Sequence, residues 1–401
     1  MTEKTAQKVN IAEAIKEYVK RDREFALFLA VGVFVGISQG INFTVFNNYL
    51  NDIHNLSASL RGIVEFPREL PGMLVMLVLG VLSFLGDIRM SVIGMICAAL
   101  GFMGLGLFSP TFSVMLVWLM TYSLGTHVFM PLSASIGMSL SQKEDYGRRL
   151  GRYNAYNLAA TIAGYAIVWL GFKYLSFTYK TAFIIGAVCY IIAAGFLLAM
   201  KADKPKEKKI KLVLRKKYTL YYILNVINGA RKQIFLTFAP WVLIQVYHLD
   251  PPTFAILGVM VSLLSIVTRT VIGDAIDKKG ERFVLSLGAM LIIVICIGYS
   301  AAGDLFSAGI AVIVLSACYI IDNSMNVVEM ARSTYVKKIA LYPEDVTPTL
   351  SAGVSFDHII AMTIPFFGGV IWTAFGYKYV FMLAAVIAVV NLYFTMKIKV
   401  E

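Results

Sequence analysis

Charged residues are scarce in this chain. Of its 401 residues, 15% are charged and 58% are hydrophobic, and the mean hydropathy is +0.74. A soluble domain carries about 25% charged residues, so this chain lacks the polar surface that a water-soluble globule needs. The same scarcity excludes an intrinsically disordered protein. The composition therefore indicates that lipid surrounds most of the chain.

Cysteine and histidine are also rare, with four of each. The cysteines lie in apolar runs and lack metal-ligand spacing, which is typical of packing residues: Cys97, Cys189, Cys296 and Cys318. No H-x-x-x-H or C-x-x-C pair occurs, so the sequence predicts no metal site. No P-loop pattern occurs, so we expect no direct use of ATP. Nothing in the sequence indicates an enzyme or a cofactor.

The chain contains many long apolar runs. Each is long enough for a bilayer-spanning helix of roughly 20 residues, and none shows the short alternation of barrel strands. The twelve predicted spans are 25–50, 60–86, 90–109, 112–140, 153–173, 180–200, 218–247, 253–273, 283–303, 305–335, 349–375 and 377–397. The fold class predicted from these runs is an all-α polytopic membrane protein with twelve transmembrane helices.

The net charge of +12 is distributed very unevenly. If the N-terminus is cytoplasmic, 27 of the 36 Lys and Arg residues fall on that side and three fall in the opposite loops. The positive-inside rule then predicts that both termini are cytoplasmic and that the protein lies in the cell (inner or plasma) membrane. The charge is thus an orientation signal, and no nucleic-acid partner is expected. We expect no cleavable signal peptide, because the first apolar run is too long for one.

A long basic segment divides the chain into two halves of similar length. We predict a cytoplasmic tail at 1–24, a six-helix bundle at 25–200, a basic linker at 201–217 and a second bundle at 218–401. Similar residues recur before spans 6 and 12, at Tyr179 and Tyr377, and the offset is 198. Asp87 and Asp277 recur after spans 2 and 8 with an offset of 190. The repeats indicate duplication. Within the tail, 9–23 fits either an amphipathic helix on the inner leaflet or a solvated segment.

The loop between spans 8 and 9 carries a specific pattern. Residues 273–282 read G-x-x-x-D-x-x-G-x-R, which resembles the cytoplasmic loop motif of the major facilitator superfamily. In the first half, Ser83 stands for the leading Gly, Asp87 and Arg89 are present, and Met90 stands for the second Gly. The resemblance implies two bundles around a cavity that opens alternately to either side. It also implies a conformational latch formed by Asp87, Arg89, Gly273, Asp277, Gly280 and Arg282.

Ionisable side chains inside the spans invite explanation, since each costs roughly 2.5–3.5 kcal/mol on insertion scales. In span 2, Glu65, Arg68 and Glu69 share a helix face. The cluster is either a proton-titrating group or a structural triad whose charges neutralise one another. Spans 7 and 10 place cations and carboxylates near the midplane, where they form a solute site, a proton site or a salt bridge. The predicted substrate-binding residues are Arg231, Lys232, Asp322, Asn326, Asn42, His127 and Arg68. The predicted proton-coupling residues are Glu65, Glu69, Asp322, Asp357 and His358.

These features predict a secondary active transporter of the major facilitator superfamily. It would move a small polar organic solute by alternating access, as a symporter or antiporter coupled to protons or Na⁺, and work as a monomer in the bilayer. Whether the solute is anionic stays open. The alternatives are a multidrug efflux antiporter and a transporter-like receptor or lipid-handling protein.

Overall fold

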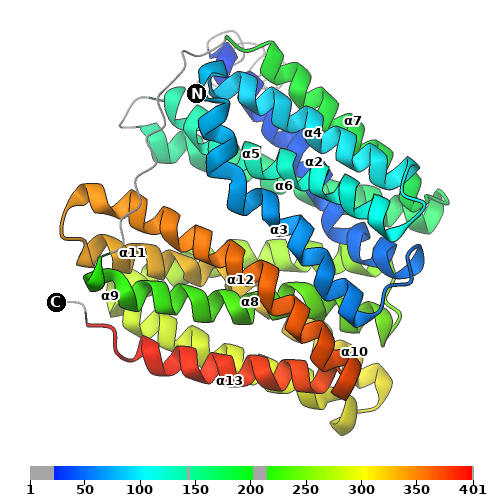
Figure 1. Ribbon diagram of the computed structural model, residues 1–401, viewed down its shortest axis with the longest axis vertical. Coiled ribbons are helices and arrows are strands. Elements are labelled where there is room, and N and C mark those ends of the chain that lie inside the picture. The colour runs from blue at the N-terminus through cyan, green and yellow to red at the C-terminus, as the bar shows by residue number, and fades with distance from the viewer. Residues whose placement is uncertain (1–21, 142–144, 202–214, 400–401) are drawn as a thin grey trace, which may run out of the picture.

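The computed structural model describes residues 22–141, 145–201 and 215–399. Most of the predicted amphipathic segment at 9–23 and most of the basic linker at 201–217 lie outside the described residues. The described residues form long helices in two groups, one above the other in Figure 1. We refer to them as the N-terminal half and the C-terminal half.

The N-terminal half contains six long helices. They are α2 (Arg23–Asp52), α3 (Ala58–Val81), α4 (Asp87–Leu107), α5 (Phe112–Ser139), α6 (Tyr146–Tyr174) and α7 (Tyr179–Leu198), with a 3₁₀ turn at Ser83–Leu85. One apolar cluster forms the core of this half, and α2, α4, α5 and α7 each contribute side chains to it. The closely packed rings of Phe102, Phe183 and Tyr190 lie within that cluster.

The C-terminal half contains the remaining helices. They are α8 (Thr219–Gln245), α9 (Pro251–Leu305), α10 (Ala308–Ser324), α11 (Glu329–Ile339), α12 (Val346–Phe375) and α13 (Tyr377–Thr395), with 3₁₀ turns at Lys216–Tyr218, Met325–Val328 and Pro343–Asp345. Two apolar clusters form its core. One is centred on Phe235, Tyr299 and Phe381, and the other on Leu224 and Val336.

Short polar side chains set the points at which several helices begin. Ser57, Thr111 and Thr178 each accept a hydrogen bond from a backbone N–H in the first turn of α3, α5 and α7. Asp250 does the same for α9, which then begins with proline. Such caps satisfy donors that the helix itself leaves unpaired. The residues directly before these helices therefore determine where each helix begins after a turn.

The predicted boundary between spans 8 and 9 is different in the structure. Both spans belong to the single 55-residue element α9, and Gly280 is its one residue with non-helical backbone angles (φ 80°, ψ 167°). Gly86 has nearly the same angles (φ 79°, ψ 163°) just before α4. A positive φ favours glycine. The backbone thus matches Gly86 with Gly280, which corrects the sequence alignment that matched Met90 with Gly280.

The predicted span 305–335 is also interrupted. It divides into α10, the turn at Met325–Val328 and α11. The side chains of Asn323 and Asn326 donate to backbone carbonyls of Tyr319 and Asn323 at 2.9 and 3.1 Å. Local side-chain bonds of this kind compete with a regular helix.

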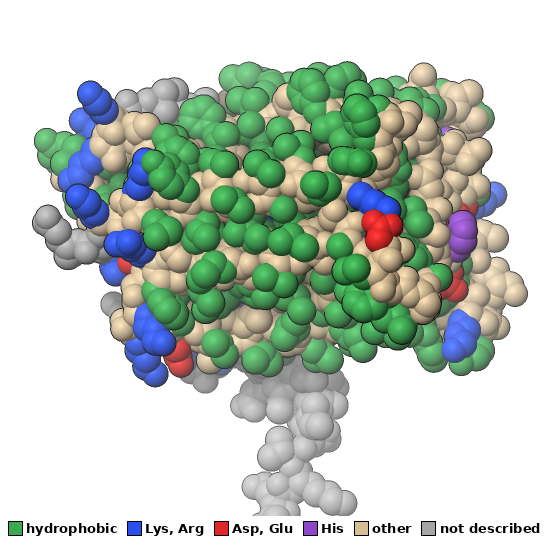
Figure 2. All heavy atoms as spheres, turned by 90° about the horizontal axis from the view of Figure 1, so that it is seen from below, with side chains coloured by type: hydrophobic (Ala, Val, Ile, Leu, Met, Phe, Trp, Pro, Cys, Tyr) green, Lys and Arg blue, Asp and Glu red, His purple; other side chains and the backbone are tan. Residues whose placement is uncertain are grey.

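The surface of the molecule is that of a membrane protein. Within the described residues, nine helices are long and apolar enough to cross a membrane, and α9 counts once among them. The polar and charged side chains of α3 and α8 leave these two helices outside that set. The predicted number of twelve spans stays a prediction. Figure 2 shows a broad apolar band with Lys and Arg gathered at one end, which we call the basic end.

The two halves meet at the opposite end, which we call the closed end. There α3 and α12 pack backbone to backbone, because a methyl group at Gly62 would lie 2.2 Å from the carbonyl oxygen of Pro365. A methyl group at Gly369 would lie 2.6 Å from the carbonyl oxygen of Ala58. The Asn48 amide donates across the halves to the Leu249 carbonyl at 2.7 Å. Among the described residues, the hydrogen bonds that join the halves run from this end to the centre.

Candidate functional site

A buried group of alternating charges follows one face of α3. Glu65 contacts Arg61 and Arg68, with N–O distances of 2.5 Å to each. Arg68 also contacts Glu69 at 3.0 Å. The side chain of Glu65 is fully buried, and that of Arg61 is 2% exposed. A buried charge is tolerated only when it is paired, so these side chains stabilise one another.

The predicted cluster of Glu65, Arg68 and Glu69 is thus brought together, but the prediction omitted Arg61. Its signal in the sequence was its position one helical turn before Glu65. The guanidinium of Arg61 also donates to Asn47 at 3.1 Å and lies over the ring of Trp241, 5.9 Å from its centroid. Trp241 belongs to α8, so Arg61 contacts both halves.

Glu65 also reaches the C-terminal half directly. Gln233 of α8 donates to the Glu65 carboxylate at 3.1 Å and lies 3.4 Å from the Thr237 hydroxyl. A carboxylate held from both halves changes its surroundings whenever the halves move apart. Glu65 is therefore placed to sense the conformation of the protein.

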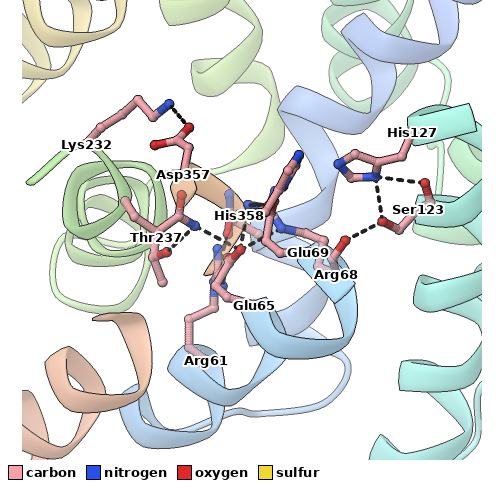
Figure 3. A network of polar contacts seen from close by, with 12 residues as sticks. Arg61, Glu65, Arg68, Glu69, Ser123, His127, Lys232, Thr237, Asp357 and His358 are labelled. Carbon is pink, nitrogen blue, oxygen red and sulfur yellow. Dashed lines mark hydrogen bonds and ion pairs between the residues drawn. The ribbon is translucent and has the colours of Figure 1, made fainter. Parts of the chain in front are cut away.

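Two imidazoles stand beside Glu69. His358 of α12 contacts the Glu69 carboxylate at 3.0 Å, across the boundary between the halves. His127 of α5 lies against His358, with the ring centroids 5.3 Å apart. The Nδ1–H of His127 donates to the Ser123 carbonyl at 2.9 Å. Figure 3 shows this group together with the charges of α3.

Two further ion pairs lie in the C-terminal half. Arg231 of α8 contacts Asp322 of α10, and each residue is 4% exposed. The neighbouring Lys232 contacts Asp357 of α12 at 2.6 Å, and these side chains are 18% and 29% exposed. Adjacent helical residues point in different directions, so one cation enters the bundle core and the other faces a more open space. Of these two cations, Lys232 is the more accessible.

Close approach to α8 depends on a glycine. A methyl group at Gly229 would lie 2.3 Å from the Asp357 carboxylate oxygen. Gly229 lies about one turn before Lys232 on α8. Only glycine at position 229 leaves room for the Asp357 side chain. The carboxylate is therefore held against α8 by backbone shape as well as by charge.

Two other predicted substrate-binding residues, Asn42 and Asn326, lie away from the charges of α3. The Oδ1 atom of Asn42 is buried and has no hydrogen-bond partner among the described residues. Asn326 is exposed and borders a cavity of about 20 Å³ beside Arg231 and Lys232. Neither asparagine contacts the charges of α3 in the structure.

The predicted latch residues are arranged differently from the expectation. Asp87 is buried at the start of α4, where the Ser135 hydroxyl donates to it. Asp277, Arg89 and Arg282 are exposed. The matching backbone angles of Gly86 and Gly280 align Asp87 with position 281 and not with Asp277, and the latch role of the predicted residues stays a prediction.

The residue that matches Asp87 is Glu281, directly after Gly280. Glu281 is 1% exposed and contacts Lys338 of α11 at 2.8 Å. Sequence reasoning missed it because the aspartate of the loop motif drew attention to position 277. The positive φ at Gly280 is what aligns Glu281 with Asp87.

The central charges balance. Four cations pair with four carboxylates in this region of the structure. The cations are Arg61, Arg68, Arg231 and Lys232, and the carboxylates are Glu65, Glu69, Asp322 and Asp357. None of these eight side chains lacks a partner of opposite charge.

Sequence comparison places these features among known proteins. The profile of the family described as the Major Facilitator Superfamily matches residues 27–340. No curated protein sequence matches the chain significantly.

Three solved structures with a similar fold are distant from this chain in sequence. A point mutant of the nucleoside transporter NupG is similar with a TM-score of 0.77 at 15% identity, over 93% of this chain and 99% of that one. An auto-inhibited peptide transporter of the POT family gives a TM-score of 0.74 at 12% identity, over 94% and 98% of the two chains. A bacterial homologue of the human lysosomal transporter Spinster, inward-facing and occupied, gives 0.71 at 15% identity, over 94% and 96%. At these identities the likeness shows the fold alone.

Proposed function

The chain belongs to the major facilitator superfamily, and from that premise we propose that it is a secondary active transporter that moves a small polar organic solute by alternating access. The observation that carries this proposal is the group of paired charges on α3, which contacts the C-terminal half through Gln233 and His358. Its central carboxylate, Glu65, is held by two arginines of α3 and by Gln233 of α8. When the halves move relative to each other, the contact between Glu65 and Gln233 has to rearrange.

We propose that the accessible ion pair of Lys232 and Asp357 receives the solute. A solute with an anionic group competes with Asp357 for Lys232 and leaves the buried pairs intact. A charge-assisted hydrogen bond of this kind contributes about 1.5–3 kcal/mol. The exposure of both side chains supports this assignment. Arg231 then acts from within the bundle by holding Asp322.

Coupling follows from the cost of leaving a buried carboxylate without its partner. Glu65 and Asp322 are 0% and 4% exposed. When a conformational change separates either group from its arginine or amide partner, binding a proton removes the uncompensated charge. We therefore propose that protons are the coupling ion and that these two carboxylates carry them.

The orientation of the protein completes the proposal. From the positive-inside rule we propose that the basic end faces the cytoplasm. The contacts of Gly62 and Gly369 close the opposite side. We propose that in this conformation, closed at the opposite side, the solute exchanges with the cytoplasm, and that the protein lies in the cell membrane.

The binding step can be tested on purified protein in detergent. A thermal-shift screen of small carboxylates, phosphorylated solutes, nucleosides and dipeptides would identify a stabilising solute. Lys232→Met should weaken its binding roughly 10- to 150-fold, because it removes one charge-assisted contact. Lys279→Met, which alters an exposed lysine at the basic end, is the matched control and should bind normally. Stabilisation by lipophilic cations alone would instead support multidrug efflux.

The coupling step needs proteoliposomes with an imposed pH gradient and the solute found in the screen. The wild-type protein should accumulate the solute against its gradient. Glu65→Gln and Asp322→Asn should retain solute exchange and lose accumulation, whereas Glu344→Gln, in an exposed loop position, should behave as wild type. Flux that ignores the pH gradient, or unchanged accumulation in both variants, would contradict proton coupling by these residues.

A further inference from the structure

We propose that Glu69, His127 and His358 form a binding site for a divalent transition-metal ion of the Zn²⁺ class, shared between the two halves. One ligand atom from each of these side chains lies within 4.8 Å of the other two. Glu69 and His127 come from α3 and α5 of the N-terminal half, and His358 comes from α12 of the C-terminal half. The three residues are far apart in the sequence, so no short motif announces them.

The chemistry of the donors matches this class of ion. Two imidazoles and one carboxylate are a common ligand set for zinc with an open fourth position, and imidazole also suits iron, copper and nickel. Metal–ligand bonds of about 2.0–2.1 Å place tetrahedral ligand atoms about 3.3 Å apart. The ligand atoms, which lie at most 4.8 Å apart, would therefore close by about 1.5 Å or less around an ion. The Glu69 and His358 side chains are 13% and 16% exposed, which leaves access for an ion.

The backbone makes room for the two rings. A methyl group at Gly72 would lie 2.5 Å from Cε1 of His358 and 2.7 Å from Cδ2 of His127. Any larger residue would push the imidazoles apart. Gly72 stands in α3, three residues after Glu69, so the same helix supplies the carboxylate and the space.

Hydrogen bonds already orient two of the three ligands. The Nδ1–H of His127 donates to the Ser123 carbonyl, which leaves Nε2 as the atom with a free lone pair. Arg68 contacts Oε1 of Glu69 at 3.0 Å, which leaves Oε2 facing His358. Outer partners of this kind typically fix the orientation of metal ligands.

The outer partners are themselves connected. The Ser123 hydroxyl donates to the Arg68 carbonyl and lies 3.0 Å from Nδ1 of His127. One serine thus links the residue that orients the carboxylate to the histidine of α5. A simple ion pair between Glu69 and His358 needs neither His127 nor this connection. The arrangement of three donors with supporting contacts is what favours a metal site.

The test is zinc binding to the purified full-length chain with any polyhistidine tag removed. Thermal unfolding is measured in excess chelator and in buffered free Zn²⁺. Zinc should raise the unfolding temperature of the wild-type protein in a saturable way. His127→Gln and His358→Gln should each lose most of this shift, because each removes one of the three ligands.

The remaining two histidines supply matched controls. His54→Gln and His248→Gln alter residues outside the cluster and should keep the full zinc response. An equal zinc response in the wild-type protein and in His127→Gln or His358→Gln would overturn the proposal, as would no saturable response at all.

A spectroscopic measurement on the wild-type protein does not depend on whether the variants fold. Zinc X-ray absorption should show nitrogen and oxygen ligands that include imidazole. Sulfur ligands would assign the zinc to cysteines and refute the site. Because binding is measured directly, this outcome is independent of whether the protein transports a solute.

Discussion

Replacing Gly62 with alanine tests whether the contact between α3 and α12 holds the closed end together. The added methyl group would lie 2.2 Å from the Pro365 carbonyl oxygen, and a backbone oxygen cannot rotate away. In a conformation where the halves separate at this end, the clash disappears. The substitution therefore raises the free energy of one conformation and leaves the other almost unchanged.

The size of the effect follows from packing. Overpacking a tight interior typically costs about 1–3 kcal/mol. Applied to one of two conformations, this shifts their ratio about 5- to 150-fold. Alanine also gains up to about 1 kcal/mol of helix propensity over glycine, but in both conformations, so it cancels. Gly80→Ala on the same helix is the matched control, because nothing lies within 4 Å of its added methyl group.

Pulsed electron resonance can report the two populations. Spin labels at Ile53 and Leu305 would mark the closed end of each half, since both side chains are well exposed. The labels are introduced in a background without the native cysteines. Gly62→Ala should increase the fraction with long label distances, and Gly80→Ala should leave it unchanged. An identical distance distribution in Gly62→Ala and the wild type would refute the proposed role of this contact.

Three further substitutions probe other contacts. Arg61→Met should lower stability by about 3–5 kcal/mol by leaving Glu65 buried without one partner, and adding Glu65→Leu should restore much of the loss in thermal unfolding. Gly280→Ala should cost about 1–2 kcal/mol because of its positive φ, whereas Gly273→Ala, helical and in open space, should be neutral or stabilising. Lys338→Met should lower the unfolding temperature, because its carboxylate partner is 1% exposed; an unchanged temperature would show that this pair contributes little.

Much of the fold could be predicted because hydropathy acts over whole helices. The expected span 112–140 and the observed Phe112–Ser139 differ by one residue, since caps and apolar runs agree there. The loop motif was harder, because its helix continues through the turn and only Gly280 departs from helical angles. A backbone angle is not visible in residue identities. The division of the chain at 201–217 stays a prediction.

In the site, contacts within one helix could be predicted from the sequence, whereas contacts between distant helices could not. Contacts one turn apart, such as that between Glu65 and Arg68, follow from helical spacing alone. The contact between Glu69 and His358 joins positions 289 residues apart. Such a contact depends on helix rotation and on the approach of two bundles, which periodicity does not specify. The same limit hid the group formed with His127.

The pairing of every central charge has an electrical consequence. With both histidines neutral, the network of four cations and four carboxylates carries no net charge. A membrane potential acts on net charge, at about 2.3 kcal/mol per elementary charge per 100 mV. If each pair moves as a unit, the network therefore adds no net charge movement to the conformational change of the empty protein. Any current through the loaded protein then equals the charge of the solute plus that of its protons, so current and flux together count the protons carried in each cycle.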